Sequence, residues 1–336
     1  MSGVDRGRAH MRRYIATRLH SFHVAISNVE LQKQIERFWR IEESGDSNNY
    51  TKDEHACETH FINNVSNNSK NRYIVMLPIK SDVLQQLEDS REIAMKRFFG
   101  LEKQLHRDLS MRTSYVHFLL EYLALGHMRL VLTHAVDRES VYLPHHGVFK
   151  GIGRNTKSRV VFDASYKTTT GISLNDALMI GPTVQQDLIS ILIRFCTFAY
   201  VFTADIVKMY RQILIHGSQL HLQRILWRKN PSSPVDTYEL LTVTYGTDSA
   251  PFLATRCLQH LAKKHALDYP AGAQCVLRDF YVDDLLAGAN TLLEARRIRD
   301  EVIALLKRGR FELGKWALNS RELLQGISDT ASVELR

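Results

Sequence analysis

Cysteine is scarce in this sequence, and the residues present form no recognisable metal-binding or cross-linking pattern. The chain contains four cysteines, which are Cys57, Cys196, Cys257 and Cys275. No two of them form a C-x-x-C pair, so the sequence argues against a zinc module of the usual spacing. Their wide separation also argues against a disulfide framework and fits a reducing compartment.

Long apolar runs are also absent. No window approaches the roughly 18 uninterrupted apolar residues that a membrane-spanning helix needs. The most apolar stretch, residues 188–202, contains Arg194 and is interpreted as a buried helix leading into a buried strand. The N-terminus is rich in arginine but has no apolar core, so we expect no secretory signal and only a faint likeness to a mitochondrial transit peptide. An intracellular, cytoplasmic location is therefore expected.

The chain has 336 residues, a hydrophobic fraction of 44%, a net charge of +8 and a pI near 9.3. This length and composition are typical of a globular protein with a sizeable packed core. A positive surplus of this size is compatible with a polyanionic partner such as nucleic acid. It is equally compatible with a basic protein that has no nucleic-acid role.

The order of the expected elements predicts an α+β fold. Residues 81–128 follow a helical repeat of apolar residues, and two strand segments around residues 141–149 and 159–162 predict a hairpin. The expected elements that follow are a helix opened by a Thr183–Gln186 capping box, a strand at 198–206, a helix from 249, a hairpin at 276–288, a helix from Thr291 to Gly309 and a strand at 311–318. This order is typical of a ferredoxin-like antiparallel sheet.

Three acidic residues are candidates for a catalytic role. Asp205 ends an apolar strand, and Asp283 and Asp284 lie between the apolar pairs 281–282 and 285–286. A hairpin turn can bring the first of the adjacent acids, Asp283, beside the Asp of a neighbouring strand while Asp284 stays close by, and carboxylates gathered in this way suit Mg²⁺. Two Mg²⁺ ions can stabilise the attacking and leaving oxygens of a phosphoryl displacement. The alternative is an ordinary polar turn, because Asp favours turns.

The residues around these acids resemble the reverse transcriptase region, fingers and palm, of the BEL/Pao-type LTR retrotransposon polyprotein. The similar runs are LPHHGVFK (143–150), RVVFDAS (159–165), KMYRQI (208–213), RILW (224–227), VTYGT (243–247), SAPFLA (249–254) and RDFYVDDLL (278–286). The helical segments 31–39, 91–101 and 125–128 are similar as well. The resemblance covers nearly the whole chain from about residue 30, and it implies a right-hand polymerase with fingers and palm, preceded by a mainly helical N-terminal region.

The resemblance divides the chain into three parts. Residues 1–140 correspond to a mainly helical extension or spacer, residues 141–320 to the fingers–palm domain, and residues 321–336 to a truncated tail. Because the sequence ends soon after Trp316, the thumb, connection, RNase H and integrase regions are expected to be absent. Whether the chain polymerises unaided is left open.

The resemblance also implies roles for the acids and for the residues beside them. Asp205 and Asp283 correspond to the metal-bridging aspartates, Asp284 to the third acid, and the carbonyl of Ile206 to a backbone metal ligand. The implied cofactor is a pair of Mg²⁺ ions, with Mn²⁺ as a substitute. Lys315 corresponds to a lysine that protonates pyrophosphate.

Further residues are implied to bind the nucleotide. Tyr210 corresponds to an aromatic gate against the ribose 2′-hydroxyl, with ordinary core packing as the alternative. Arg159 corresponds to the arginine that grips the triphosphate, a role that suits a planar guanidinium, although a solvated strand charge is the alternative. Lys157 is one of several phosphate-binding candidates, together with Lys150 and Arg154. Gly246 is implied to let the backbone approach the nucleotide or template, and Tyr245 lies where related enzymes often carry Gln.

The leading hypothesis is RNA-directed DNA polymerase activity on a primed RNA or DNA template with deoxynucleoside triphosphates, in the cytoplasm or in virus-like particles. The second is a truncated remnant that binds nucleic acid without turnover. A third, a palm-fold enzyme such as a nucleotide cyclase, is disfavoured by Arg159 and the run 249–251. Two departures from the family pattern are Val207, where an acid is common, and the extra charge of Asp248.

Overall fold

The computed structural model describes residues 50–87, 89–132, 140–150, 157–325, 327 and 333–335. Only the backbone is described for residues 149, 150, 157, 158 and 333–335. The chain divides into two compact units, Met1–Asn49 and Tyr50–Arg336, and all described residues belong to the second. None of the helices in the described part has the length and apolar character needed to cross a membrane.

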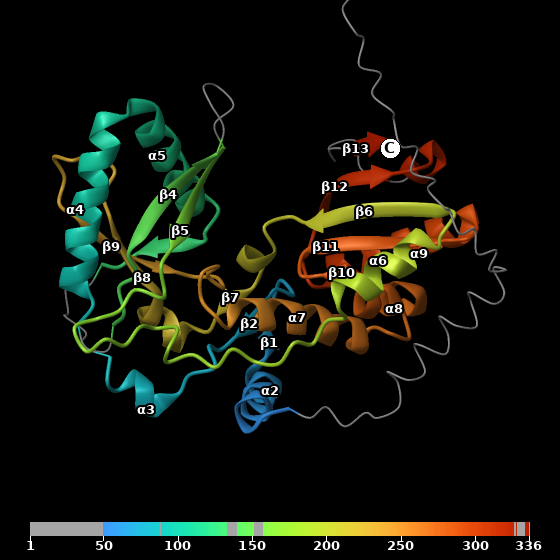
Figure 1. The fold of residues 1–336 in the computed structure, drawn as a ribbon, viewed down its shortest axis with the longest axis horizontal. Helices are drawn as coiled ribbons and strands as arrows, with labels where there is room; N and C mark the ends of the chain where they lie inside the picture. The colour runs from blue at the N-terminus through green and yellow to red at the C-terminus, as the bar shows by residue number, and fades with distance from the viewer. Residues whose placement is uncertain are drawn as a thin grey trace, which may run out of the picture. The chain divides into compact units, whose positions relative to one another are not determined.

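The C-terminal half of this unit is built on a five-stranded sheet with the order β10-β11-β6-β12-β13 (Figure 1). Its strands are β6 (Tyr200–Ile206), β10 (Phe280–Tyr281), β11 (Asp284–Ala289), β12 (Leu313–Leu318) and β13 (Val333–Leu335). The central strand β6 pairs antiparallel with β11 on one side and with β12 on the other. Because side chains alternate along a strand, Phe202, Ala204 and Ile206 are buried while Asp205 lies on the opposite face.

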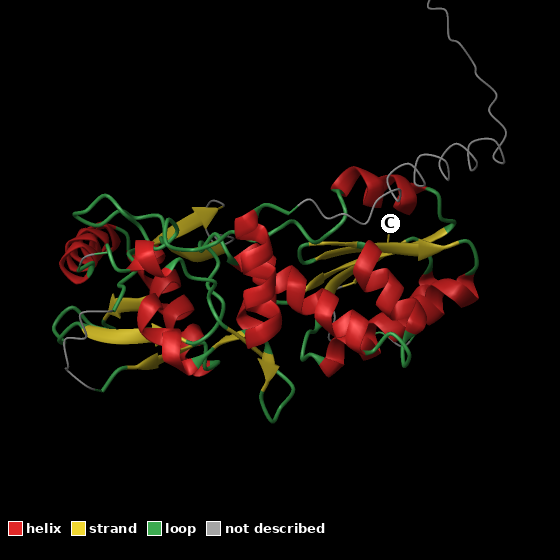
Figure 2. Ribbon diagram, turned by 90° about the horizontal axis from the view of Figure 1, so that it is seen from below, coloured by secondary structure: helices red, strands yellow, loops and turns green. Residues whose placement is uncertain are grey.

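Four helices lie close to this sheet, and Figure 2 shows helices (red) packed along its strands (yellow). They are α6 (Leu188–Cys196), α7 (Ala250–Lys264), α8 (Pro270–Arg278) and α9 (Leu292–Arg308). Helix α9 contacts β6 and β11, and it packs along α8 and against α7. The predicted start of α9 is confirmed, because the Glu294 amide donates to the Thr291 hydroxyl at 3.3 Å.

The remaining strands form three smaller sheets. The predicted hairpin is confirmed as β4 (His145–Lys150) paired antiparallel with β5 (Lys157–Phe162). The second sheet contains β3 (Met128–Leu130), β9 (Asp236–Leu240) and β8 (Arg224–Trp227), and the third contains β1 (Ser66–Asn67), β2 (Tyr73–Val75) and β7 (Leu214–Ile215). The predicted α+β fold class therefore holds, and most strand pairs are antiparallel.

The described residues between 50 and 140 contribute four helices and three strands to the same compact unit. The helices are α2 (Lys52–Asn64), α3 (Ser81–Leu84), α4 (Arg91–Arg107) and α5 (Leu109–Ala124). Strand β2 pairs with β7 and strand β3 pairs with β9, and the buried core of the unit includes Tyr73 and Tyr115 together with Phe202. Over this range the extension expected from the sequence is thus continuous with the rest of the described chain, and residues 1–49 lie outside the described part.

Two expected elements differ in the structure. The helix expected to begin near Thr183 begins at Leu188, because the Asp187 carboxylate accepts from the Ser190 amide at 2.9 Å and caps it there. Residues 276–278, expected in the acidic hairpin, form the last turn of α8 instead. Pro270 in the first turn of α8 favours a helix start that the apolar run from residue 276 concealed.

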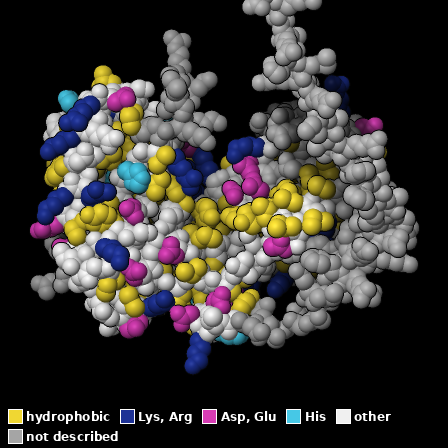
Figure 3. All heavy atoms as spheres, in the orientation of Figure 1, with side chains coloured by type: hydrophobic (Ala, Val, Ile, Leu, Met, Phe, Trp, Pro, Cys, Tyr) yellow, Lys and Arg dark blue, Asp and Glu magenta, His cyan; other side chains and the backbone are white. Residues whose placement is uncertain are grey.

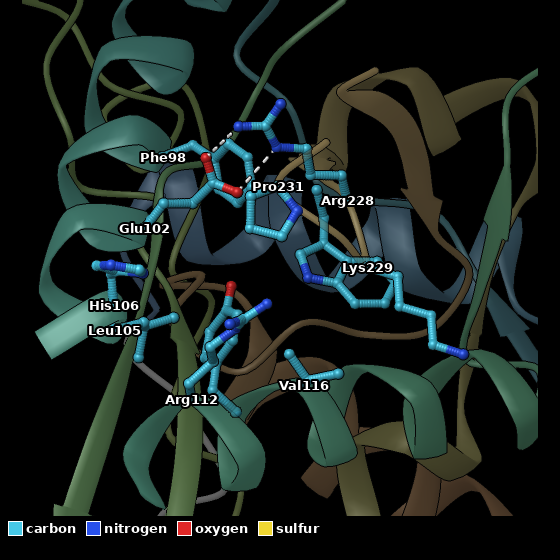
Figure 4. Close-up of a pocket in the computed structure, with 11 residues that line it drawn as sticks. Phe98, Glu102, Leu105, His106, Arg112, Val116, Arg228, Lys229 and Pro231 are labelled. Carbon is cyan, nitrogen blue, oxygen red and sulfur yellow. Dashed lines mark hydrogen bonds and ion pairs between the residues drawn. The ribbon is translucent and has the colours of Figure 1, made fainter. Parts of the chain in front are cut away.

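Helix α4 is attached to β8 by a pair of charges beside a small pocket (Figure 4). Arg228 donates to both carboxylate oxygens of Glu102, at 2.9 Å and 2.6 Å, and both side chains are largely buried. The pocket has a volume of about 40 Å³ and apolar walls that include Phe98 and Trp227. None of the site residues predicted from the sequence lines it, and the contact serves to join α4 to the strand.

A buried histidine predicts how the stability of this unit depends on pH. The Nε2–H group of His145 donates to the Leu226 carbonyl at 2.9 Å, and Nδ1 accepts from the Tyr115 hydroxyl at 2.5 Å. Burial lowers the pKa of His145 from 6.5 to about 4. Between these values the unfolded chain binds the proton and the folded chain does not, so the free energy of unfolding falls as the pH drops, by up to about 3 kcal/mol for this group.

Urea unfolding followed between pH 7.5 and pH 4.5 measures this dependence. His145→Gln should be less stable at neutral pH and should lose part of the pH dependence, while the same change at the exposed His117 should leave the dependence intact. Equal pH dependence in the parent and in His145→Gln would contradict the burial of a neutral imidazole.

Candidate active site

The pairing of β6 with β11 places two aspartates directly opposite each other. Asp205 is the cross-strand partner of Asp284, and the same register buries Ala204 opposite Leu285. Directly opposite residues of antiparallel strands have Cβ atoms about 4.5–5.5 Å apart, and like charges at such positions repel. The sheet therefore holds two negative charges close together on its open face.

The third acid lies in the tight turn between β10 and β11. Tyr281 pairs with Asp284, which leaves Val282 and Asp283 as the two turn residues. The amide of Ile206 donates to the carbonyl oxygen of Asp283 at 2.8 Å, so the turn is joined to the end of β6. The three acids therefore lie close together where β6 ends and β11 begins, but the residue directly opposite Asp205 is Asp284, and not Asp283 as was expected from the sequence.

Lys315 brings a positive charge close to these acids. Its ammonium group forms an ion pair with the Asp205 carboxylate, from a position on β12 where the register shifts between Gly314 and Ala317. The hydrogen bond to Asp205 is the largest cause that raises the pKa of Lys315, and the neighbouring acids raise it further. Lys315 is therefore protonated at neutral pH, as an acid catalyst must be before it gives up a proton.

The electrostatics of Asp284 reflect its neighbours. Burial is the largest cause that raises its pKa above the ordinary value of 3.8, and repulsion by Asp283 and Asp205 raises it further. The ammonium of Lys315 acts in the opposite direction. The negative form of this carboxyl is therefore disfavoured unless another cation is present.

The acids leave one carboxylate oxygen without a partner. In the part of the chain that the structure describes, no group of three or more His, Cys, Asp or Glu side chains is arranged to hold a metal ion. The Oδ1 atom of Asp205, however, is buried without a hydrogen-bond partner among the described residues. A carboxylate oxygen left in this way suits Mg²⁺, which is usually bound through one or two carboxylates together with substrate phosphates.

The residues expected to bind the nucleotide belong to elements other than the β10–β11 hairpin. Arg159 on β5 is exposed, and its guanidinium lies 4.6 Å from the centre of the Tyr245 ring. The Tyr245 hydroxyl donates to the carbonyl oxygen of Val160, which fixes the ring against β5. Tyr245 is thus a support for Arg159, a role that the sequence did not predict.

Tyr210 connects this group with the acids. It belongs to a 3₁₀ helix, Met209–Gln212, that follows β6 directly. Burial is the largest cause that raises the pKa of its hydroxyl, the negative charge of Asp283 raises it further, and the positive charge of Arg159 lowers it. Tyr210 therefore lies within electrostatic range of both Asp283 and Arg159.

Gly246, which follows Tyr245, has a backbone conformation that favours glycine. Its φ is +106°, and a Cβ atom there would come within 2.3 Å of the Phe162 carbonyl oxygen. Asn175 holds the same turn, because its amide donates to the Gly246 carbonyl at 3.2 Å and to Asp248 at 2.9 Å. Asn175 belongs to no sequence motif, so the sequence did not predict its role in this turn. The carboxylate of Asp248, noted above as an extra charge, accepts the Asn175 hydrogen bond.

The cationic residues expected to bind phosphate are only partly described. Lys157 begins β5, paired with Lys150 of β4, and the side chains of both lie outside the described atoms. Arg154 lies outside the described residues. Their proposed contacts with phosphate remain predictions.

A cavity opens beside the acids on the outer face of the sheet. Its volume is about 480 Å³, and Thr203, Leu286, Tyr281 and Leu188 line it together with Asp205, Asp284 and Lys315. Figure 3 shows acidic side chains gathered next to a band of apolar side chains on the face drawn in Figure 1. The cavity therefore has both apolar walls and charged groups, so a ligand bound in it would contact both.

Comparison with known proteins gives matches at the level of structure alone. No protein-family model matches the sequence, and no curated protein matches it. The chain is similar to the prototype foamy virus protease–reverse transcriptase, with 16% identity and a TM-score of 0.47 over 61% of this chain and 24% of that chain. It is also similar to a foamy viral protease–reverse transcriptase in complex with double-stranded DNA, with 18% identity and a TM-score of 0.43 over 57% of this chain and 28% of that chain. The chain thus spans about a quarter of the length of these proteins.

Gly246 provides a test of how tightly its turn packs against Phe162. Gly246→Ala should lower the free energy of unfolding by at least about 2 kcal/mol, because the added Cβ meets the Phe162 carbonyl in addition to the strained φ. Gly171→Ala is the matched control, since its φ is +78° but no described atom lies within 4 Å of the added Cβ. It should cost about 1 kcal/mol, and equal losses in urea unfolding would contradict the close contact.

Proposed function

We propose that this chain carries the polymerase centre of a reverse transcriptase of the BEL/Pao retrotransposon type. The observation that supports this best is the cross-strand pairing of Asp205 with Asp284, next to Asp283 in the adjoining turn. Paired acids, with Tyr210 within electrostatic range of both Asp283 and Arg159, suit the transfer of a nucleotide to a primer 3′-hydroxyl. The substrates are deoxynucleoside triphosphates and a primed RNA or DNA template.

The acids would hold the metal ions. Asp205, Asp283 and the carbonyl of Ile206 are the proposed ligands, with Asp284 as the third acid. Two bound Mg²⁺ ions, or Mn²⁺ in their place, would activate the primer hydroxyl and neutralise the charge that develops on the triphosphate. The unpartnered Oδ1 atom of Asp205 and the mutual repulsion of the acids support this assignment.

The other residues would bind and orient the substrates. Arg159, supported by the Tyr245 ring, would donate to triphosphate oxygens, with Lys157 as a further cation. Tyr210 would press on the sugar and exclude a 2′-hydroxyl. The Gly246 turn would lie against the nucleotide, and the cavity beside Tyr281 and Leu286 would take the primer end. Lys315 would donate the proton that the leaving pyrophosphate requires.

Primer extension on an RNA template with Mg²⁺ tests the proposed function. The parent chain should extend the primer, and Asp283→Asn should lower the rate roughly 100- to 1,000-fold because the variant loses a charged ligand at the reacting centre. Asp236→Asn, at an exposed position on β9, is the matched control and should keep the parental rate.

The same experiment separates the proposal from its alternative. A parent chain that binds primed template with a clear salt dependence but never extends it would favour the non-catalytic remnant. A parent chain that does neither would overturn both.

The role of Tyr210 is tested by sugar selectivity. Tyr210→Ala should reduce the preference for deoxynucleotides over ribonucleotides by at least about tenfold, because a smaller side chain leaves room for the 2′-hydroxyl. Tyr210→Phe keeps the ring and should retain the preference. Steady-state incorporation of both nucleotide types gives the ratio, and an unchanged ratio in Tyr210→Ala would reject the role.

A further inference from the structure

The turn that carries Asp283 has a strained backbone. Val282 has a φ of +56°, in the left-handed region that β-branched residues rarely occupy. Its partner in the turn, Asp283, is not among the residues with a positive φ. In a two-residue hairpin turn, a first position with positive φ favours glycine. A valine at this position needs support from elsewhere in the fold.

Gln185 supplies such support from a distant segment. Its side-chain oxygen accepts a hydrogen bond from the Val282 amide at 2.9 Å. The Asp283 carbonyl at the other end of the same dipeptide accepts from the Ile206 amide at 2.8 Å. The two turn residues are therefore held from both sides, one by β6 and the other by Gln185.

The segment that contains Gln185 is itself anchored. The Gln259 side chain of α7 donates to the carbonyl of Val184, one residue before Gln185. Gly181 lies so close to Phe252 that a Cβ atom would come within 2.4 Å of its ring. Gln185 thus extends from a segment fixed against α7.

Its neighbour Gln186 belongs to a second contact with the same hairpin. The Gln186 side chain accepts from Arg194 at 2.9 Å, and Arg194 donates to Asp279, just before β10, at 2.8 Å. Both glutamines therefore face the hairpin, but only Gln185 reaches the turn itself.

We propose that Gln185 is a positioning residue that keeps Val282 in its left-handed conformation and thereby fixes the Asp283 carboxylate as a metal ligand. The inference rests on the proposed function, because it concerns the use of Asp283. Without the acceptor, valine relaxes toward a negative φ, the turn rearranges, and Asp283 moves relative to Asp205. Gln185 touches no substrate and acts only through the turn.

Metal binding by the free chain gives the first test. Mn²⁺ affinity measured by electron paramagnetic resonance, without nucleic acid, should fall about tenfold in Gln185→Met, which keeps the length of the side chain but loses the acceptor. Gln185→Glu keeps an acceptor oxygen and should bind within about threefold of the parent. Gln104→Met, at an exposed position on α4, is the matched control and should bind as the parent does.

A second substitution separates positioning from general stability. Glycine adopts the left-handed conformation without strain, so Val282→Gly should restore most of the lost Mn²⁺ affinity in the Gln185→Met background. Loss of affinity that Val282→Gly does not restore would overturn the proposal, as would parental affinity in Gln185→Met. A role limited to stability predicts no such rescue.

Hydrogen exchange of the Val282 amide in the unaltered chain gives a test that depends on neither a variant nor a metal. Exchange slowed at least about tenfold relative to an unprotected turn amide is expected, and unprotected exchange would overturn the contact. If the parent binds no Mn²⁺ while this amide is protected, the proposed function fails and the hydrogen bond stands. If Mn²⁺ binds and the amide is unprotected, the inference about Gln185 fails and the proposed function stands.

Discussion

Repulsion between Asp205 and Asp284 is the constraint on which the candidate site depends. The two acids face each other because the buried alternation of β6 and β11 sets the register, with Ala204 opposite Leu285 in the core. A slip of one residue would turn these apolar side chains outward, so the packing of the sheet against α9 prevents the acids from separating. The free energy of burying the apolar face thus holds two like charges together, and their repulsion favours any cation that binds between them.

Several features accommodate this concentration of charge. Lys315 offsets part of it through its ion pair with Asp205. Gly314, the other cross-strand neighbour of Asp205, leaves room there, since a Cβ atom would lie 3.8 Å from the Asp205 Oδ1 atom and 2.8 Å from Val207. The strained turn at Val282 is held on one side by β6 and on the other by Gln185. The groups that bind substrate in the proposed reaction come from separate elements, and a continuous core fixes their relative positions.

Local features of this fold were predictable from the sequence, and long-range ones were not. The β4–β5 hairpin and the capped start of α9 depend on neighbouring residues, and both were predicted. The predicted start of α6 was wrong because Thr183 and Asp187 are both residue types that cap helices. The hydrogen bond from the Ser190 amide to the Asp187 carboxylate shows that the helix is capped at Asp187. The contact of Gln185 with Val282 joins residues 97 positions apart, and that of Asn175 with Asp248 joins residues 73 apart. No local pattern indicates either contact, although the acids themselves were visible as charges enclosed by apolar strands.

We expect the sheet to hold Asp205 and Asp284 together against their electrostatic repulsion, and a bound divalent cation to reduce that repulsion. Thermal unfolding of the parent and of Asp284→Asn, each with and without Mg²⁺ or Mn²⁺, measures this directly. Asp284→Asn should be more stable than the parent in the absence of metal, because one of two facing charges is removed. Metal should raise the unfolding temperature of the parent and have much less effect on the variant. A variant that is less stable than the parent without metal, together with equal metal effects in both proteins, would contradict the account.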